Sequence, residues 1–191
     1  MEQKRRILKM KRVKCYIITF LGAIIFLCGC ANPIKDGTEA LEKKDYAAAV
    51  TAFQEAADSE DKETSADGYR GLGIAFFEQE KYTQALSYLE KAVGAGSPQM
   101  PQIYNLMGIS AMQIKETEKA KEYFAAGIAL AGTGTGGAVD SDLVREMRYN
   151  EIVCMEELLD WKGASEKAEQ YILLYPDDEG MKKEAEFLKT R

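Results

Sequence analysis

The chain repeats itself along its length, and this periodicity limits its fold more than any other feature. Residues 45–56 match residues 81–92, 36 positions further on, and residues 69–76 match residues 104–111, 35 positions further on. The first two segments share an aromatic residue, two alanines and a large apolar residue at equal spacing: Tyr46, Ala49, Phe53 and Ala56, then Tyr82, Ala85, Leu89 and Ala92. A repeat of this length indicates a stack in which each copy buries its apolar face against its neighbours.

The spacing within each copy predicts paired helices. Small residues at fixed places let two helices approach closely, and large residues at i, i+3, i+4 and i+7 fill the seam between them. The chain's four prolines are Pro33, Pro98, Pro101 and Pro176, so none interrupts 34–97 or 102–175. No segment alternates apolar and polar residues between hairpin turns, and we therefore predict an all-α fold without strands.

The pattern resembles the tetratricopeptide repeat, a helix–turn–helix unit of about 34 residues. Four copies run in phase, at about 34–63, 66–99, 101–134 and 145–178. The second copy carries most of the family's signature: Tyr69, Leu72, Gly73, Phe76, Tyr82, Ala85, Leu89 and Ala92. The other copies depart from it: the first has a shortened first helix and keeps only Gly37, the third has Thr117 for the aromatic residue and Gly127 for alanine, and the fourth has Glu151-Ile152 for Leu-Gly. The resemblance implies a right-handed superhelical stack of antiparallel helix pairs over 37–178.

A ninth helix is expected to cover the C-terminal end of this stack, because a repeat array exposes apolar surface at its ends unless a polar cap covers it. Within 179–191, Met181, Ala185 and Leu188 share one face and the charged residues share the other. The alternative is a frayed tail.

The N-terminal 29 residues have the pattern of a cleaved export signal. Residues 1–14 hold seven basic residues and one acid, and 15–28 hold no charge. This apolar run is shorter than the roughly 20 residues that span a bilayer. Leu27-Cys28-Gly29-Cys30 resembles the bacterial lipobox, which implies that the Cys30 thiol receives a diacylglycerol and that cleavage leaves Cys30 as the first residue. We therefore expect a lipoprotein anchored on the extracytoplasmic face of the cell membrane, with 30–36 as a tether; the alternative is an uncleaved membrane helix.

The mature chain would be strongly acidic. Residues 30–191 hold 18 of the chain's 25 basic residues and 30 of its 31 acidic residues, a net charge of −12. Such a charge disfavours binding to a nucleic-acid backbone and repels anionic lipid. We expect no nucleic acid among the partners.

Several residue patterns invite a chemical interpretation, and each has a structural one that we prefer. The chain contains no histidine, which excludes Ser-His-Asp and Cys-His catalysis and histidine-ligated metal sites. Cys154 has acidic neighbours and is expected to be a small core residue. Gly132–Gly137 matches G-x-G-x-x-G, but the preceding residues are expected to be helical, and we predict a loop. The acidic clusters lack a calcium-binding pattern and are expected to be solvated, and Trp161 is expected to pack. We predict no enzyme activity, no cofactor and no metal.

The family resemblance also implies where a partner would bind. The inner face of such a stack is lined by the first helix of each unit and binds extended peptides or helices. The matching positions are Arg70, Ile74, Phe77, Glu78, Asn105, Ile109, Met112, Gln113, Tyr149, Val153 and Glu156, with Thr38 and Leu41 from the first unit. Family members that clamp a C-terminal carboxylate use lysine, asparagine and arginine here, where this chain has apolar Ile74, Ile109 and Val153.

We therefore expect an apolar groove with a polar rim and a non-catalytic protein–protein interaction scaffold. The structural alternative for each apolar residue is that it packs against neighbouring helices. The functional alternative is a solute-binding or enzyme-associated lipoprotein with a small-molecule site in the groove.

Overall fold

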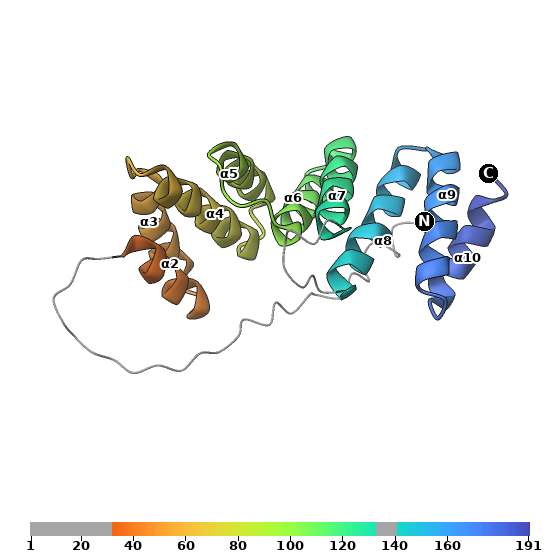
Figure 1. Ribbon diagram of the computed structural model, residues 1–191, viewed down its shortest axis with the longest axis horizontal. Coiled ribbons are helices and arrows are strands. Elements are labelled where there is room, and N and C mark those ends of the chain that lie inside the picture. The colour runs from red at the N-terminus through yellow and green to blue at the C-terminus, as the bar shows by residue number, and fades with distance from the viewer. Residues whose placement is uncertain (1–31, 133–140) are drawn as a thin grey trace. The chain divides into compact units, whose positions relative to one another are not determined.

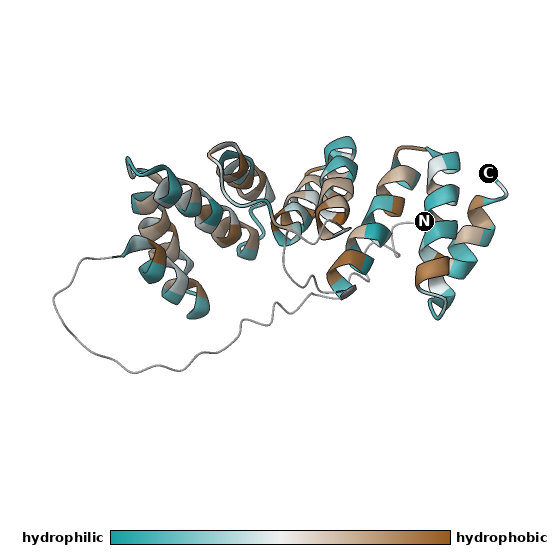
Figure 2. Ribbon diagram, in the orientation of Figure 1, coloured by the Kyte–Doolittle hydropathy of each residue, from teal (hydrophilic) through white to brown (hydrophobic). Residues whose placement is uncertain are grey.

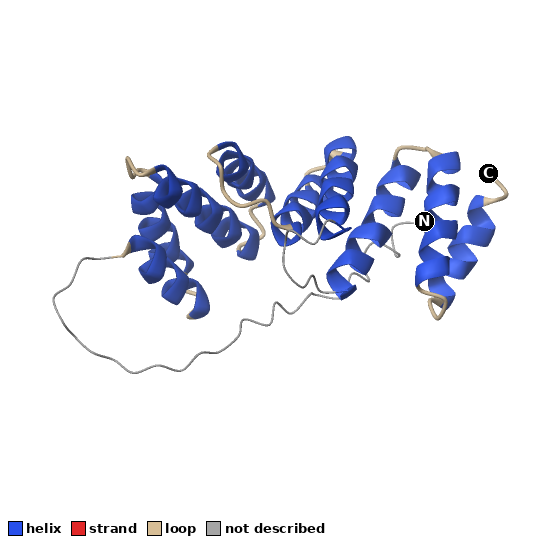
Figure 3. Ribbon diagram, viewed as in Figure 1, coloured by secondary structure: helices blue, strands red, loops and turns tan. Residues whose placement is uncertain are grey.

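The computed structural model describes residues 32–132 and 141–191, and every regular element in these two ranges is a helix (Figures 1 and 3). The helices are α2 (Pro33–Glu42), α3 (Tyr46–Ala57), α4 (Lys62–Glu78), α5 (Tyr82–Gly94), α6 (Pro101–Gln113), α7 (Thr117–Gly132), α8 (Ser141–Glu157), α9 (Trp161–Leu174) and α10 (Glu179–Leu188). The prediction of an all-α chain is confirmed. The predicted lipidation site Cys30 and residues 133–140 of the predicted loop lie outside the described residues.

The helices form four consecutive pairs and one final helix. Each helix packs against the next one along the chain, and the pairs are α2–α3, α4–α5, α6–α7 and α8–α9. The first helices of neighbouring pairs also contact one another, whereas within the described ranges no second helix contacts another second helix. The four first helices therefore line one continuous side of the stack, which we call the inner face.

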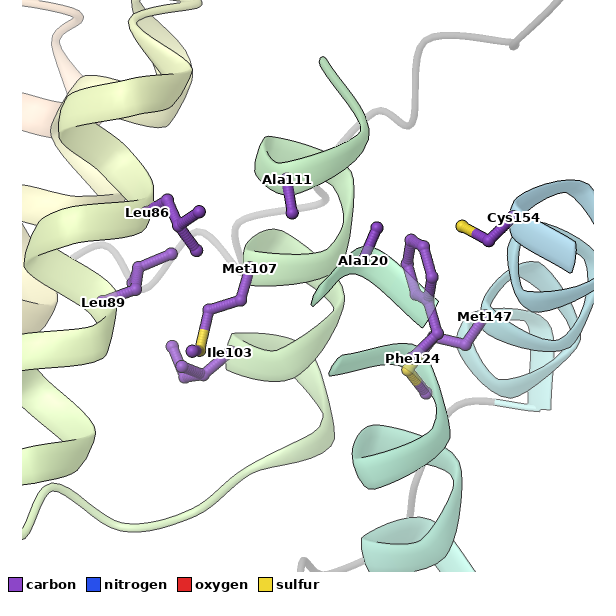
Figure 4. Close-up of a cluster of buried hydrophobic side chains, with 9 residues drawn as sticks. All are labelled: Leu86, Leu89, Ile103, Met107, Ala111, Ala120, Phe124, Met147 and Cys154. Carbon is purple, nitrogen blue, oxygen red and sulfur yellow. The ribbon is translucent and has the colours of Figure 1, made fainter. Parts of the chain in front are cut away.

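Apolar and polar residues follow one another along these helices (Figure 2). Their buried residues form three core clusters along the unit Asn32–Arg191. The central cluster joins α5, α6, α7 and α8 and consists of Leu86, Leu89, Ile103, Met107, Ala111, Ala120, Phe124, Met147 and Cys154 (Figure 4). Each cluster is built from two or more consecutive helices, as expected for a repeat array.

Two glycines permit close approach of the helices inside their pairs. A Cβ atom on Gly73 of α4 would lie 2.5 Å from Leu89 Cδ2 of α5, and one on Gly108 of α6 would lie 2.5 Å from Phe124 Cε1 of α7. Both neighbours are fully buried, so they have little room to move. Gly73 thus lies in a helix–helix seam, as its place in the repeat predicts.

Each first helix ends in the same backbone conformation. Lys44, Glu80, Lys115 and Leu159 have φ values of 58°, 60°, 67° and 61°. The N–H of the residue after each of them donates to a carbonyl in the last turn of the helix, as from Lys81 to Phe76. This left-handed C-terminal cap is usually glycine, so the sequence carries no signal for it here.

The fourth pair accommodates two residues that depart from the repeat. Glu151 stands where the repeat has leucine, and its buried carboxylate accepts a hydrogen bond from Lys167 Nζ at 2.7 Å. Ile152 stands where the repeat has glycine and packs against Ala164 and Ala168 of α9. The α8–α9 contact is smaller than the α4–α5 contact, as expected where a large side chain replaces glycine in a helix–helix seam.

At the ends of the stack, the structure changes one expected boundary and confirms the expected capping helix. α2 begins at Pro33, so residues 33–36 are helical where we expected tether. Proline suits the first helical position, and the Asn32 side chain accepts a hydrogen bond from the Lys35 N–H at 3.1 Å and caps the helix. At the other end, α10 buries Met181, Ala185 and Leu188 against α9. The capping helix is confirmed, and the frayed tail is excluded for 179–188.

Candidate partner-binding face

The predicted partner-binding residues come from three successive first helices. Arg70, Ile74 and Phe77 lie on α4, Asn105, Ile109 and Met112 on α6, and Tyr149 and Val153 on α8. α4 contacts α6, and α6 contacts α8, so these residues belong to one continuous face. Asn105 is buried, the Tyr149 side chain is 44% exposed, and the others are half-buried.

The apolar residues of this face divide into two groups. Phe77 packs against the core cluster formed by residues of α2, α3, α4 and α5, and its ring lies edge-on to the ring of Tyr82. Ile109 and Met112 pack against the central cluster. These three residues therefore pack against neighbouring helices, as the alternative interpretation expected, and also lie on the inner face. Ile74 and Val153 are half-buried and belong to none of the three described clusters, which makes them the cleaner positions for testing the face.

Arg70 already has partners within the chain. Its guanidinium forms an ion pair with Asp67, with an Nη2–Oδ1 distance of 2.9 Å, and donates a weaker hydrogen bond to Ser97 Oγ at 3.3 Å. These contacts connect α4 to the turn before α6. Part of the hydrogen-bonding capacity of Arg70 is therefore used within the chain.

A shallow cleft of about 420 Å³ lies beside Arg70. It is lined by Lys62, Glu63, Ala66, Asp67, Arg70 and Ala95–Pro98, at the N-terminal end of α4. Because its arginine and one of its carboxylates are paired with each other, the cleft offers few uncommitted charged groups to a small molecule.

The structure adds one residue to the face that sequence analysis missed. Glu146 lies on α8 one turn before Tyr149, and its half-buried carboxylate accepts a hydrogen bond from the Asn105 side chain of α6. Burial raises the pKa of Glu146, and the Asn105 hydrogen bond opposes this to a smaller extent. In the sequence analysis, Glu146 stood at the very start of the fourth unit, which was placed at about 145–178, whereas α8 begins at Ser141 and Glu146 lies inside the helix. The i, i+3 spacing from Tyr149 was the available signal.

Two further predictions about chemistry concern Cys154 and the glycine-rich segment. The Cys154 side chain is fully buried, and burial raises the pKa of its thiol to about 12, with Glu157 and Glu151 adding to the effect. The prediction that Cys154 is a small core residue is confirmed. The glycine-rich segment follows the helix α7, not a strand, so the geometry required for a dinucleotide fingerprint is missing.

Comparison with known proteins settles the family. The model of the Tetratricopeptide repeat family matches residues 35–101 and 71–135. The chain belongs to this family. No curated protein sequence is significantly similar to the chain.

Solved structures with the same fold support this assignment. MamA from Desulfovibrio magneticus RS-1 matches with a TM-score of 0.65 and 16% identity over 84% of this chain and 86% of that one. MamA of strain AMB-1 matches with a TM-score of 0.59 and 17% identity over 83% and 86% of the two chains. The TPR domain of Arabidopsis OM64 matches with a TM-score of 0.52 and 11% identity over 69% and 99%. At these identities the likeness shows the fold alone, a stack of helical repeats.

No helix within 32–132 or 141–191 is long and apolar enough to cross a membrane. In the same part of the chain, no three acidic or cysteine side chains group as metal ligands would.

Proposed function

We propose that the protein is a membrane-anchored, non-catalytic interaction scaffold that binds a peptide or helix of a partner protein along its inner face. The observation that carries the proposal is the continuous strip of Phe77, Ile109, Met112, Tyr149 and Val153 on three adjoining first helices. Aromatic residues and methionine suit such a surface, because they bury much area and methionine adapts to different partners.

The charge of the chain favours a particular partner. The net charge of −12 over residues 30–191, with exposed Glu78 on the same face, complements a segment that is apolar with basic flanks. Complementary charge speeds association and selects among partners more than it adds affinity.

The proposed location rests on the sequence. A basic head, a short apolar run and Leu27-Cys28-Gly29-Cys30 support export and lipid attachment at Cys30. Two acyl chains would hold the protein stably at the extracytoplasmic face of the membrane. The scaffold would then gather its partner close to the membrane surface.

Lysine substitutions test the binding face without disturbing the core. Ile74→Lys and Val153→Lys each place a charge on the inner face at a position outside the three described clusters. Leu173→Lys is the matched control, because Leu173 of the second helix α9 is 82% exposed. We expect proteins cross-linked to the full chain in membranes to be lost with the first two variants and retained with the third, while all three keep the wild-type melting temperature. Retention of every partner by folded Ile74→Lys and Val153→Lys would reject the inner face as the binding site.

A further inference from the structure

Glu146 is a carboxylate between two first helices of the inner face, with an asparagine as its partner. It extends from α8, is half-buried, and accepts a hydrogen bond from Asn105 of α6. Tyr149 lies one turn further along α8, and Ile109 lies one turn beyond Asn105 along α6. The carboxylate therefore lies beside the apolar strip and not at the outer edge of the face.

This carboxylate has no cation within the described part of the chain. No lysine or arginine nitrogen in 32–132 or 141–191 lies within 4 Å of Glu146, which is the distance at which ion pairs form. The nearest arginine in sequence, Arg145, is committed elsewhere: its Nη2 lies 2.7 Å from Asp178 Oδ2, and its Nε donates to Tyr171 OH at 2.9 Å. A partly buried carboxylate without a countercharge is costly to keep.

Asn105 carries an acceptor without a donor. The residue is only 5% exposed, and its Oδ1 atom is buried and receives no hydrogen bond. Buried polar atoms in proteins nearly always have partners, and those that lack one call for an explanation. At this place, Asn105 Oδ1 has no donor within the described residues, and the one donor that Glu146 has, Asn105, carries no positive charge.

We propose that Glu146, positioned by Asn105, receives a lysine or arginine side chain of the partner, with apolar residues on either side of that cation lying against Ile109 and Val153. This inference rests on the proposed function and specifies the chemistry of the partner. It places a basic residue inside the binding segment, at a fixed distance from its apolar anchors. The cation supplies the donors and the positive charge that the Asn105–Glu146 pair lacks. Glu146 thus becomes the determinant of which apolar segments the face accepts.

Selection of peptides from a random display library tests this inference with the full chain. Wild type, Glu146→Gln and Glu186→Gln are each used as the target. Glutamine keeps the shape of Glu146 and its ability to accept from Asn105, and Glu186 is an exposed carboxylate of the capping helix α10, outside the inner face. We expect wild type and Glu186→Gln to select peptides with lysine or arginine at one position between apolar residues. Glu146→Gln should select the same apolar spacing without the basic residue.

A charge reversal and an affinity measurement complete the test. Glu146→Lys should select aspartate or glutamate at the position where wild type selects a cation. A wild-type-selected peptide should bind Glu146→Gln about 10- to 100-fold more weakly, as expected for the loss of a hydrogen bond to a charged group. If peptides bind but show the same basic preference on wild type and Glu146→Gln, or none on wild type, the role of Glu146 is rejected while the binding face stands. If wild type selects no peptide at all, both the inference and the proposed function are rejected.

Discussion

At the scale of single residues, Leu159 shows that the turns retain strain that a substitution could relieve. Its φ of 61° lies in the left-handed region, and its side chain is 67% exposed, so it contributes little packing. A residue with a Cβ atom pays about 1–2 kcal/mol in this conformation, whereas glycine does not. We expect Leu159→Gly to raise the free energy of unfolding by about 0.5–1 kcal/mol, because the greater flexibility of unfolded glycine offsets part of the gain.

The control for Leu159→Gly is Gln170→Gly, at an exposed position inside α9. Glycine in a helix costs about 0.5–1 kcal/mol relative to alanine, so this variant should melt at a lower temperature than wild type. Thermal denaturation of both variants measures the difference. A melting temperature for Leu159→Gly at or below that of wild type would show that the turn is not strained.

The close approach at Gly73 is tested by a pair of identical changes. Gly73→Ala places a Cβ atom 2.5 Å from Leu89 Cδ2, whereas a Cβ atom on Gly94, at the end of α5, meets nothing within 4 Å. We expect Gly73→Ala to destabilise the protein by about 1–3 kcal/mol, as overpacking does. Gly73→Leu should be worse, and Gly94→Ala should leave stability within about 0.5 kcal/mol of wild type. Equal denaturation midpoints for the two alanine variants would show that Gly73 does not lie in a helix–helix seam.

At the scale of elements, the last three helices are joined through Asp178. Its Oδ2 accepts hydrogen bonds from Arg145 Nη2 of α8 at 2.7 Å and from Tyr171 OH of α9 at 3.0 Å, and its Oδ1 accepts from the Met181 N–H of α10 at 3.1 Å. Burial acts to raise the pKa of Asp178, but these hydrogen bonds outweigh it and the net pKa is lowered. The capping helix is therefore held by a carboxylate that must be ionised.

This network predicts how stability changes in acid. Because the folded pKa of Asp178 lies below the unfolded value of about 3.9, its contribution is complete above that value and is lost as the pH falls through the folded pKa. Asp178→Asn should lower the stability of the α9–α10 contact by about 1–3 kcal/mol at pH 7. The difference from wild type should shrink toward pH 2, and Asp177→Asn, at an exposed neighbour, should change little. Hydrogen exchange in α10 measures both effects, and a difference independent of pH would contradict this account.

The elements also show which parts of the structure could be predicted from sequence. The helix pairs were predictable, because small and large residues recur at fixed spacing and the prolines fall only near helix starts and turns. The left-handed caps at Lys44, Glu80, Lys115 and Leu159 were not, because none of them is the glycine that normally marks such a cap. The ion pair between buried Glu151 and Lys167 was not predictable either, because an acid at a leucine position gives no sign of the lysine that neutralises it.

At the scale of the whole molecule, the candidate site also has features that the sequence predicts and features that it does not. The face itself was predictable, since every first helix presents the same repeat positions to it. The division of its apolar residues between core and surface was not, because it depends on how far each neighbouring helix lies from the face. The Asn105–Glu146 contact joins residues 41 positions apart on two units, and no local pattern links them.

The proposed anchoring of the molecule predicts a simple change in its maturation. Labelling with a radioactive fatty acid should reach the wild-type protein and be lost in Cys30→Ser, which should accumulate as the uncleaved precursor. Cys28→Ser is the matched control, because Cys28 lies two residues earlier in the part that would be removed, and it should be labelled and cleaved as wild type is. Continued labelling and processing of Cys30→Ser would exclude the lipobox interpretation.

The most direct test of the central claim, that the inner face binds a partner, is photocross-linking from defined positions in intact cells. A photoreactive amino acid replaces Tyr149 on the inner face or Leu173 on the outer helix α9; both side chains are exposed, at 44% and 82%. The account predicts a discrete cross-linked protein from position 149 that is lost when Val153→Lys is added, and none from position 173. A cross-link from position 173 alone, or one from position 149 that persists with Val153→Lys, would contradict it.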